Sequence, residues 1–206
     1  MRPALFLAAL ALAIPAAAQE PALPKTPPGA PIAARVKAGN YKVDGDHTQV
    51  LFKVNHLGFS EYSGQFTKPT GSLTLDPRNP ARDRVEISFP INQVRTTVTT
   101  LDEHLQKPEF FDAARFPEGR FVSTRVTVKG MTAVIAGNLT LKGVTRPVVL
   151  NARFVGAGAM VMGPPKLNIG FSATTSIRRS AFGISYGVPL VSDRVDLVIN
   201  AAFQAE

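Results

Sequence analysis

Apolar and polar residues alternate along most of this chain from Tyr41 onward. Around residue 87, for example, Val85, Ile87 and Phe89 alternate with Glu86 and Ser88. Successive side chains of a β-strand point to opposite faces, so each alternating segment predicts a strand with one apolar face. The same period recurs in segments 50–56, 122–128, 131–142, 144–154, 167–173 and 191–203.

Turn signals separate these segments. They are Asp44-Gly45, Asp76-Pro77, Lys129-Gly130, Lys142-Gly143 and the glycine-rich stretch 156–165. Short connections between strands that are apolar on one face are typical of antiparallel sheets. The pattern therefore predicts an all-β fold of about eight strands, either a sandwich or a closed barrel.

The segment HLQKPEFFDAARFPEGRF, residues 104–121, interrupts the alternation. Before it, Thr100 to Glu103 read TLDE, a capping-box pattern that predicts a helix beginning at Thr100. Pro108 should end this helix, and Glu109 and Asp112 suit the start of a second short helical turn. We expect a short helical insert that caps the mouth of the barrel.

The first residues have the pattern of a secretory signal peptide. Arg2 precedes an apolar run, Ala4 to Ile14, and Ala16 to Ala18 supply an A-x-A cleavage site. The run is too short for a membrane-spanning helix, and no Cys follows it for a lipoprotein anchor. We therefore expect export, to the periplasm or beyond the cell.

These observations divide the chain into three parts. Residues 1–18 are the predicted signal peptide, and residues 19–38 form a Pro- and Ala-rich spacer outside the core. Residues 39–206 form one domain, long enough to bury a core without disulfide bonds, since the chain has no Cys.

The charge favours anionic partners in general. The formal net charge of +8 falls to +7 when residues 1–18 are removed, because only Arg2 is lost. Lipid head groups or a transient contact with a membrane surface fit this charge, although basic residues that stand singly on strands also fit a solvated surface. Nucleic acid is not expected, because no basic run or basic helix is present. An outer-membrane barrel is disfavoured, because no Trp and three Tyr cannot build two aromatic girdles.

The motifs of common catalytic and metal sites are missing. His47, His56 and His104 show no zinc-ligand spacing, and strand parity places His47 and His56 on opposite faces. There is no Cys nucleophile, no G-x-S-x-G motif and no glycine-rich phosphate loop. We therefore predict no catalytic residue, no metal and no cofactor.

A few residues still fit a ligand site. His56 should point inward at the end of its strand, where it could orient a head group or simply close a turn. Phe110 and Phe111 could line a cavity entrance or pack beneath the insert. Arg178 and Arg179, near Phe182, could contact an acidic head group or lie in a solvated loop, and for Arg178 we favour the loop.

Three segments in order carry a family resemblance. They are YKVDGDHTQVLFKVNHLGFSEYSGQF (41–66), DEHLQKPEFFDAARFPEGRFVSTRV (102–126) and GNLTLKGVTRPVVL (137–150), and RSAFGI (179–184) and VSDRVDLVI (191–199) extend the match. The chain is similar to the YceI family from Tyr41 to about Phe203. The resemblance implies an exported bacterial protein with an extended, lipocalin-like antiparallel β-barrel that binds polyisoprenoids or other long amphiphiles. True lipocalins usually carry a Gly-x-Trp motif, which a chain without Trp cannot have.

The resemblance also implies site residues. One family feature is absent, because Leu101 stands where many members have an Arg before the Asp of the D-x-H-L motif. The positions that match the motifs, and are carried over as ligand-binding candidates, are His56, Phe59, Phe66, Asp102, His104, Phe110, Phe111, Arg179 and Phe182.

The leading functional prediction is an exported binding protein that holds a polyisoprenoid or similar lipid for transport, storage or sequestration, with a role in stress left open. One alternative is a lipid-modifying enzyme that uses His56 or His104 as acid and base. Another is a filled barrel that serves a structural or interaction role. The resemblance also implies a homodimer. The volume of the barrel interior separates a filled barrel from a binding barrel.

Overall fold

The computed structural model describes residues 24–161 and 165–206, so the predicted signal peptide lies outside the described residues. One α-helix is present in this part of the chain, α1 (Thr99–Leu105), with the 3-10 turns η1 (Ala33–Arg35), η2 (Pro80–Arg82), η3 (Ile91–Gln93) and η4 (Arg179–Phe182). The strands are β1 (Gly39–Val43), β2 (Gln49–His56), β3 (Ser60–Phe66), β4 (Thr70–Leu75), β5 (Arg84–Pro90), β6 (Val94–Arg95), β7 (Glu118–Lys129), β8 (Thr132–Leu141), β9 (Val144–Ala159), β10 (Leu167–Arg178) and β11 (Arg194–Ala205).

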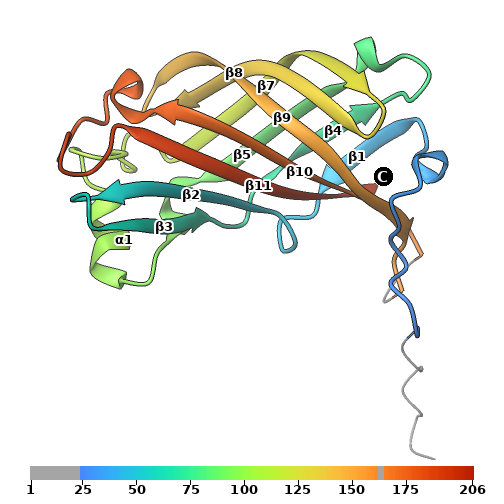
Figure 1. Cartoon of the computed structure of the whole chain (residues 1–206), viewed down its shortest axis with the longest axis horizontal. Coiled ribbons are helices and arrows are strands. Elements are labelled where there is room, and N and C mark those ends of the chain that lie inside the picture. Colours follow the sequence, from blue (N-terminus) through green and yellow to red (C-terminus); the bar gives the residue numbers. More distant parts are fainter. Residues whose placement is uncertain (1–23, 162–164) are drawn as a thin grey trace, which may run out of the picture.

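The strands form a closed antiparallel barrel (Figure 1). Eight strands make the ring in the order β1-β4-β5-β7-β8-β9-β10-β11, and β11 pairs again with β1. The all-β fold of about eight strands is thus confirmed, and of the two architectures that the alternation allowed, the barrel is the one that forms.

Strands β1 and β2 pair with the same edge of β11 at different heights. Tyr41 to Val43 of β1 pair with its C-terminal end, whereas β2 pairs with residues 196–200. In the gap, the Thr48 hydroxyl donates to the carbonyl oxygen of Ala202 and accepts from its N–H. This side chain therefore supplies the ladder bonds that the interrupted backbone cannot make.

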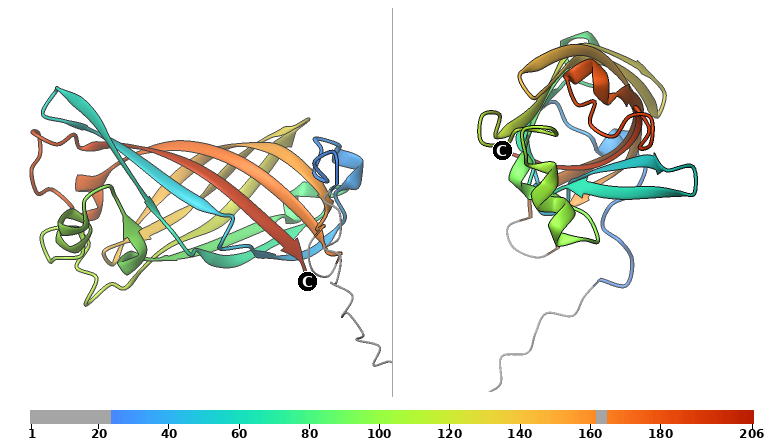
Figure 2. Two further views of the ribbon diagram at one scale, coloured as in Figure 1. Left: turned by 90° about the horizontal axis from the view of Figure 1, so that it is seen from below. Right: turned by 90° about the vertical axis from the view of Figure 1, so that its left-hand side faces the viewer.

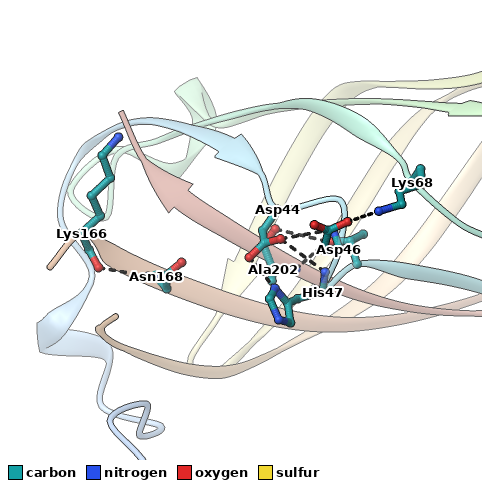
Figure 3. A network of polar contacts seen from close by, with 8 residues as sticks. Asp44, Asp46, His47, Lys68, Lys166, Asn168 and Ala202 are labelled. Carbon is teal, nitrogen blue, oxygen red and sulfur yellow. Dashed lines mark hydrogen bonds and ion pairs between the residues drawn. The ribbon is translucent and has the colours of Figure 1, made fainter. Parts of the chain in front are cut away.

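The turn between β1 and β2 is held by a small polar network (Figure 3). The backbone N–H of Asp44 donates to the Ala202 carbonyl oxygen, and the Asp44 carboxylate lies 2.7 Å from Nδ1 of His47. Asp46 pairs with Lys68 across the neighbouring turn. His47 therefore belongs to an exposed turn contact rather than to a strand face.

The two ends of the barrel differ. We call the end with α1, η4 and the β2–β3 turn the mouth, and the end with η1 and η2 the base (Figure 2). At the mouth, β2 and β3 extend beyond the ring as a hairpin, and β6 pairs with the outer edge of β3.

Part of the spacer packs on the base. Ala30 pairs with Ala157 of β9, and Arg35 donates to the Ala157 carbonyl oxygen at 3.3 Å. The hydroxyl of Tyr41, which is buried, donates to the Lys37 carbonyl oxygen at 2.6 Å. Val36 packs against the buried cluster at this end, so the expectation that the spacer stays outside the core is wrong for this residue.

The start of the helical insert differs from its prediction. Helix α1 begins at Thr99 with Val98 as N-cap and without a side-chain cap, so the capping-box prediction is wrong. Instead, the Thr96 hydroxyl accepts from the Val98 N–H, and the helix begins one residue before the predicted Thr100. The second element is a single helical turn and not a helix: the carbonyl oxygen of Asp112 accepts from the N–H groups of Arg115 and Phe116, at the position where the short turn was predicted.

Gly71 gives a test of the β4–β5 pairing. Its φ is +143°, and a Cβ at this position would collide with the backbone carbonyl oxygen of Glu86 on β5. We predict that Gly71→Ala lowers the free energy of unfolding by about 2–4 kcal/mol, measured by urea denaturation. Gly170→Ala on β10 is the matched control, since its Cβ would meet its nearest neighbour at an ordinary 3.7 Å. Equal effects of the two substitutions would contradict this account.

Candidate functional site

The barrel encloses one long cavity of about 710 Å³. Residues near both ends of β8, Ala133 and Leu141, line it, so the cavity runs along most of the barrel axis. A volume of this size is in the range of small-molecule and lipid sites. The filled-barrel alternative predicts no such space.

The cavity wall is almost entirely apolar. Phe52, Val85, Ile87, Leu150 and Ile199 line it and are only half-buried although they point inward, because they border the cavity rather than one another. The inward orientation predicted for the even-numbered residues of β2 is confirmed, since Val50, Phe52, Val54 and His56 all line the cavity.

A row of small side chains keeps one side of the cavity wide. Ala133 on β8 pairs with Ala152 on β9, which pairs in turn with Ala173 on β10, and all three line the cavity. Alanine extends only a methyl group from the wall, so three neighbouring strands occupy little of the interior at this height.

Aromatic rings narrow the cavity toward the mouth. The Phe66 ring lies 4.9 Å from that of Phe89 and 5.5 Å from that of Phe111, which meets it edge-on. Phe110 and Phe111 come from the turns after α1, and both line the cavity while packing against the core. The segment after the helix therefore caps the barrel and forms part of the cavity wall.

The η4 segment lies across the ring of strands at the mouth (Figure 2, right). Arg179 is buried there, and its guanidinium donates to four backbone carbonyl oxygens, those of Ile184, Tyr186, Val191 and Ser192, at 2.7–3.2 Å. Four of its five N–H groups are thus used to hold the loop 184–192. Burial lowers the pKa of Arg179, and the four oxygens offset part of the cost of burying its charge.

The carboxylate of Asp193 lies beside η4 but pairs with Arg178 and not with Arg179. Asp193 lies 3.4 Å from Arg178 and accepts from the Ser180 N–H at 2.8 Å, and that backbone bond, first among its contacts, holds the pKa of Asp193 below its usual range. The geometry of Arg179 is that of a residue that organises the mouth, although it also lines the cavity.

His56 lies at the rim of the cavity. It ends β2, makes an isolated bridge with Val191, and its ring centre lies 6.3 Å from that of Tyr62. Tyr62 also lines the cavity and its hydroxyl lies 3.2 Å from that of Thr97. Together with Thr96 and Arg179, these two side chains bring polar groups to the cavity wall near the mouth.

Four of the sequence-predicted residues do not line the cavity. Asp102 is buried and accepts from the Thr96 N–H at 2.7 Å, and Phe182, the last residue of η4, is buried in the core. His104 lies 2.9 Å from Glu109 on the outside of the cap, and Phe59 is 89% exposed at the tip of the β2–β3 hairpin. The five that line the cavity are His56, Phe66, Phe110, Phe111 and Arg179.

Polar residues near the base were not foreseen. Asp83 is buried, lines the cavity and accepts from the Asp76 N–H at 2.7 Å, and burial raises the pKa of its carboxyl group. Arg153 lines the cavity as well. No sequence pattern marks Asp83, whereas Tyr62 could have been found, because it shares strand parity with Phe66.

No cluster of three or more His, Asp or Glu residues that could hold a metal ion occurs among the described residues. Within the same ranges, no helix combines the length and apolar character needed to cross a membrane.

Comparison with known proteins agrees with this geometry. The family model for the YceI-like domain matches residues 41–203. The chain belongs to the YceI family. It is 40% identical to a UPF0312 protein of Enterobacter sp. (strain 638) over 165 residues, which cover 79% of this chain and 85% of that protein. It is 38% identical to Protein YceI of Salmonella arizonae over the same shares of the two chains.

Three solved structures have the same fold. A Campylobacter jejuni YceI protein superposes with a TM-score of 0.64 at 28% identity, over 74% of this chain and 90% of that one. BcnA of Burkholderia cenocepacia gives 0.69 at 21% identity, over 78% and 98%. A polyisoprenoid binding domain of Saccharophagus degradans gives 0.62 at 12% identity, over 82% and 100%.

Adjacent arginines test the role of Arg179. We predict that Arg179→Gln lowers the free energy of unfolding by about 3 kcal/mol or more, because it leaves one buried and several partly buried carbonyl oxygens without this donor. Arg178→Gln removes only an exposed ion pair and should change it by less than about 1 kcal/mol. Urea denaturation of both variants measures the difference. A small effect of Arg179→Gln would mean that the loop 184–192 does not depend on this side chain.

Asp83 gives a pH-dependent prediction. Because burial raises its pKa in the folded state, the charged carboxylate costs stability at neutral pH, and this cost disappears as pH falls through the raised pKa. Asp83→Asn keeps the oxygen that accepts from Asp76, so it should stabilise the protein at pH 7 and have no effect below the pKa of an unfolded Asp. Thermal melts across this pH range measure the effect. A difference in melting temperature between Asp83→Asn and the wild type that stayed constant with pH would contradict the account.

Proposed function

We propose that this protein is an exported binding protein that holds a long isoprenoid lipid in the interior of its barrel. The observation that carries the proposal is the apolar cavity of about 710 Å³ that runs along the closed barrel. Each methylene that leaves water for such a cavity contributes about 0.8 kcal/mol before ordering costs. A long hydrocarbon chain can therefore be held by burial alone.

The family relationship supports the choice of ligand. The chain is a YceI-like protein, and one structure with the same fold is described as a polyisoprenoid binding domain. The narrow aromatic part of the cavity near Phe66 and Phe111 suits the end of a prenyl chain or a flat head group, with His56 and Tyr62 at the rim as its polar partners.

The role that follows is reversible holding, the property that transport, storage and sequestration share. Export to the periplasm is part of the proposal and is supported by the residue pattern at 1–18 and by family membership. The proposed ligand contacts are His56, Phe66, Phe110, Phe111 and Tyr62, and Arg179 positions the loop beside them.

The alanine row gives a direct test. We predict that Ala152→Phe, which places a ring inside the cavity, weakens binding of long prenyl lipids about tenfold or more, since loss of two buried methylenes already has this effect. Prenyl alcohols of increasing length, titrated and followed by native mass spectrometry, should show a shorter preferred chain. Val155→Phe, on the outer face of the same strand, is the control and should bind as the wild type does. Unchanged binding by Ala152→Phe would place the lipid outside the barrel.

The enzyme alternative makes a different prediction. His56 lies at the rim, whereas His104 pairs with Glu109 outside the cavity, and the binding proposal needs no acid–base chemistry from either. A prenyl lipid incubated with the protein should be recovered unchanged by mass spectrometry. A product formed by the wild type and absent with His56→Ala or His104→Ala would establish the enzyme instead.

A further inference from the structure

Five large apolar side chains are exposed together at the mouth. Leu57 and Phe59 lie at the tip of the β2–β3 hairpin, and Tyr186, Val188 and Leu190 lie in the loop after η4. Phe59 is 89% exposed and Leu190 is 64% exposed. The Leu57 N–H donates to the Leu190 carbonyl oxygen at 2.7 Å, so the two segments are side by side. We call these five residues the rim patch.

The hairpin turn is not one that favours leucine. Leu57 and Gly58 have φ of 56° and 73°, as in a type I′ turn, where Asn-Gly is the preferred pair. A leucine in the left-handed region is strained, and here it is also exposed to solvent. Leu57 is therefore disfavoured both by the backbone conformation of the turn and by the exposure of its apolar side chain to water. A contact with a partner outside the chain would account for its presence.

The rim patch is held in place by the fold. Arg179 binds the carbonyl oxygens of Tyr186 and Val191, and the Ser192 N–H donates to the Asn55 carbonyl oxygen at 2.9 Å. These bonds tie the loop to both η4 and β2. The exposed side chains are therefore presented on a fixed backbone, and their insertion into another phase costs little further ordering.

The patch is continuous with the cavity. His56 and Val191, which bridge to each other, both line the cavity, and each is the chain neighbour of a patch residue, Leu57 and Leu190. A lipid that left the cavity past this bridge would pass directly over the rim patch.

The chemistry of the patch selects a lipid surface as its partner. Segments 57–60 and 184–192 contain no charged residue, and the charged residues that follow each in sequence are paired, Glu61 with Lys53 and Asp193 with Arg178. The hairpin projects beyond the ring of strands, so it would bury little area against a second folded chain (Figure 2). Lipid, in contrast, can close around a narrow apolar tip.

We infer that the rim patch inserts into a phospholipid surface and places the mouth of the cavity against the membrane, so that a hydrophobic ligand can pass between membrane and barrel without crossing water. The driving force is apolar burial, and anionic lipid is not required. The inference rests on the proposed function, yet the two can fail separately, because vesicle binding tests the patch and lipid uptake tests the cavity.

The test uses the mature chain and vesicles of phosphatidylcholine, which carry no net charge. The variant Leu57→Asn with Phe59→Ser removes two patch side chains and places Asn where the turn prefers it, so its folding should be preserved. Val134→Thr with Val149→Thr is the matched control, since these residues on the barrel wall are also about half exposed. Thermal melts confirm that all three proteins are folded.

In sedimentation with vesicles, the wild type and the control should partition equally, and the rim variant should partition at least about tenfold less, in low and high salt. The inference is overturned if the wild type does not bind, if the rim variant binds as well as the control, or if binding requires anionic lipid and is lost in salt. It is also overturned if the wild type instead self-associates and the rim variant is a monomer, which would make the patch an interface between copies.

Native mass spectrometry of the same proteins with an added prenyl alcohol separates the two hypotheses. The rim variant should still bind the lipid at equilibrium, because its cavity is intact. A wild type that binds vesicles but takes up no prenyl alcohol would contradict the proposed function and leave a membrane-binding barrel.

Discussion

Strands β1 and β11 pair at Tyr41–Ala205, Lys42–Gln204 and Val43–Phe203, and this pairing closes the sheet. Closure leaves the eight-stranded ring without a free edge, and the inward side chains of all eight strands then face one shared interior. Eight strands enclose a space whose filling depends on side-chain size, and here alanines on three neighbouring strands leave it open. The cavity is thus a direct consequence of barrel closure combined with small inward residues.

The two ends of the barrel are finished in different ways. At the base, the segment before β1 packs over the opening, with Val36 against the buried cluster. At the mouth, the closing segments are the turns after α1 and the loop that Arg179 holds by four carbonyl oxygens. This side chain holds the loop firmly, because its loss would leave four buried or partly buried carbonyl oxygens without their donor. The mouth is therefore rigid where it presents the rim patch and lined with aromatic rings where it meets the cavity.

Much of the fold could be predicted from the sequence, because strand alternation depends only on which residues face the core. The inward series ending at His56 was correct for this reason, and the same alternation placed the strands in segments 122–128, 131–142, 144–154 and 167–173. The failures depended on individual hydrogen bonds and packing contacts that the alternation of apolar and polar residues does not encode. The start of α1 is set by Thr96 rather than by its own capping box, and Val36 joins the core only because β9 lies next to it. The sequence suggested that Arg179 contacts a ligand head group. Its N–H groups bind the carbonyl oxygens of the loop 184–192, a contact that exists only in the folded loop.

The central claim is that the closed barrel holds a lipid, and the most direct measurement is the native mass of the protein purified from the cells that make it, followed by extraction into organic solvent. The account predicts one bound isoprenoid-like lipid per chain, released on extraction and identified by its mass. A protein that carries no lipid as isolated, and that takes up none from a series of added prenyl lipids, would contradict the account.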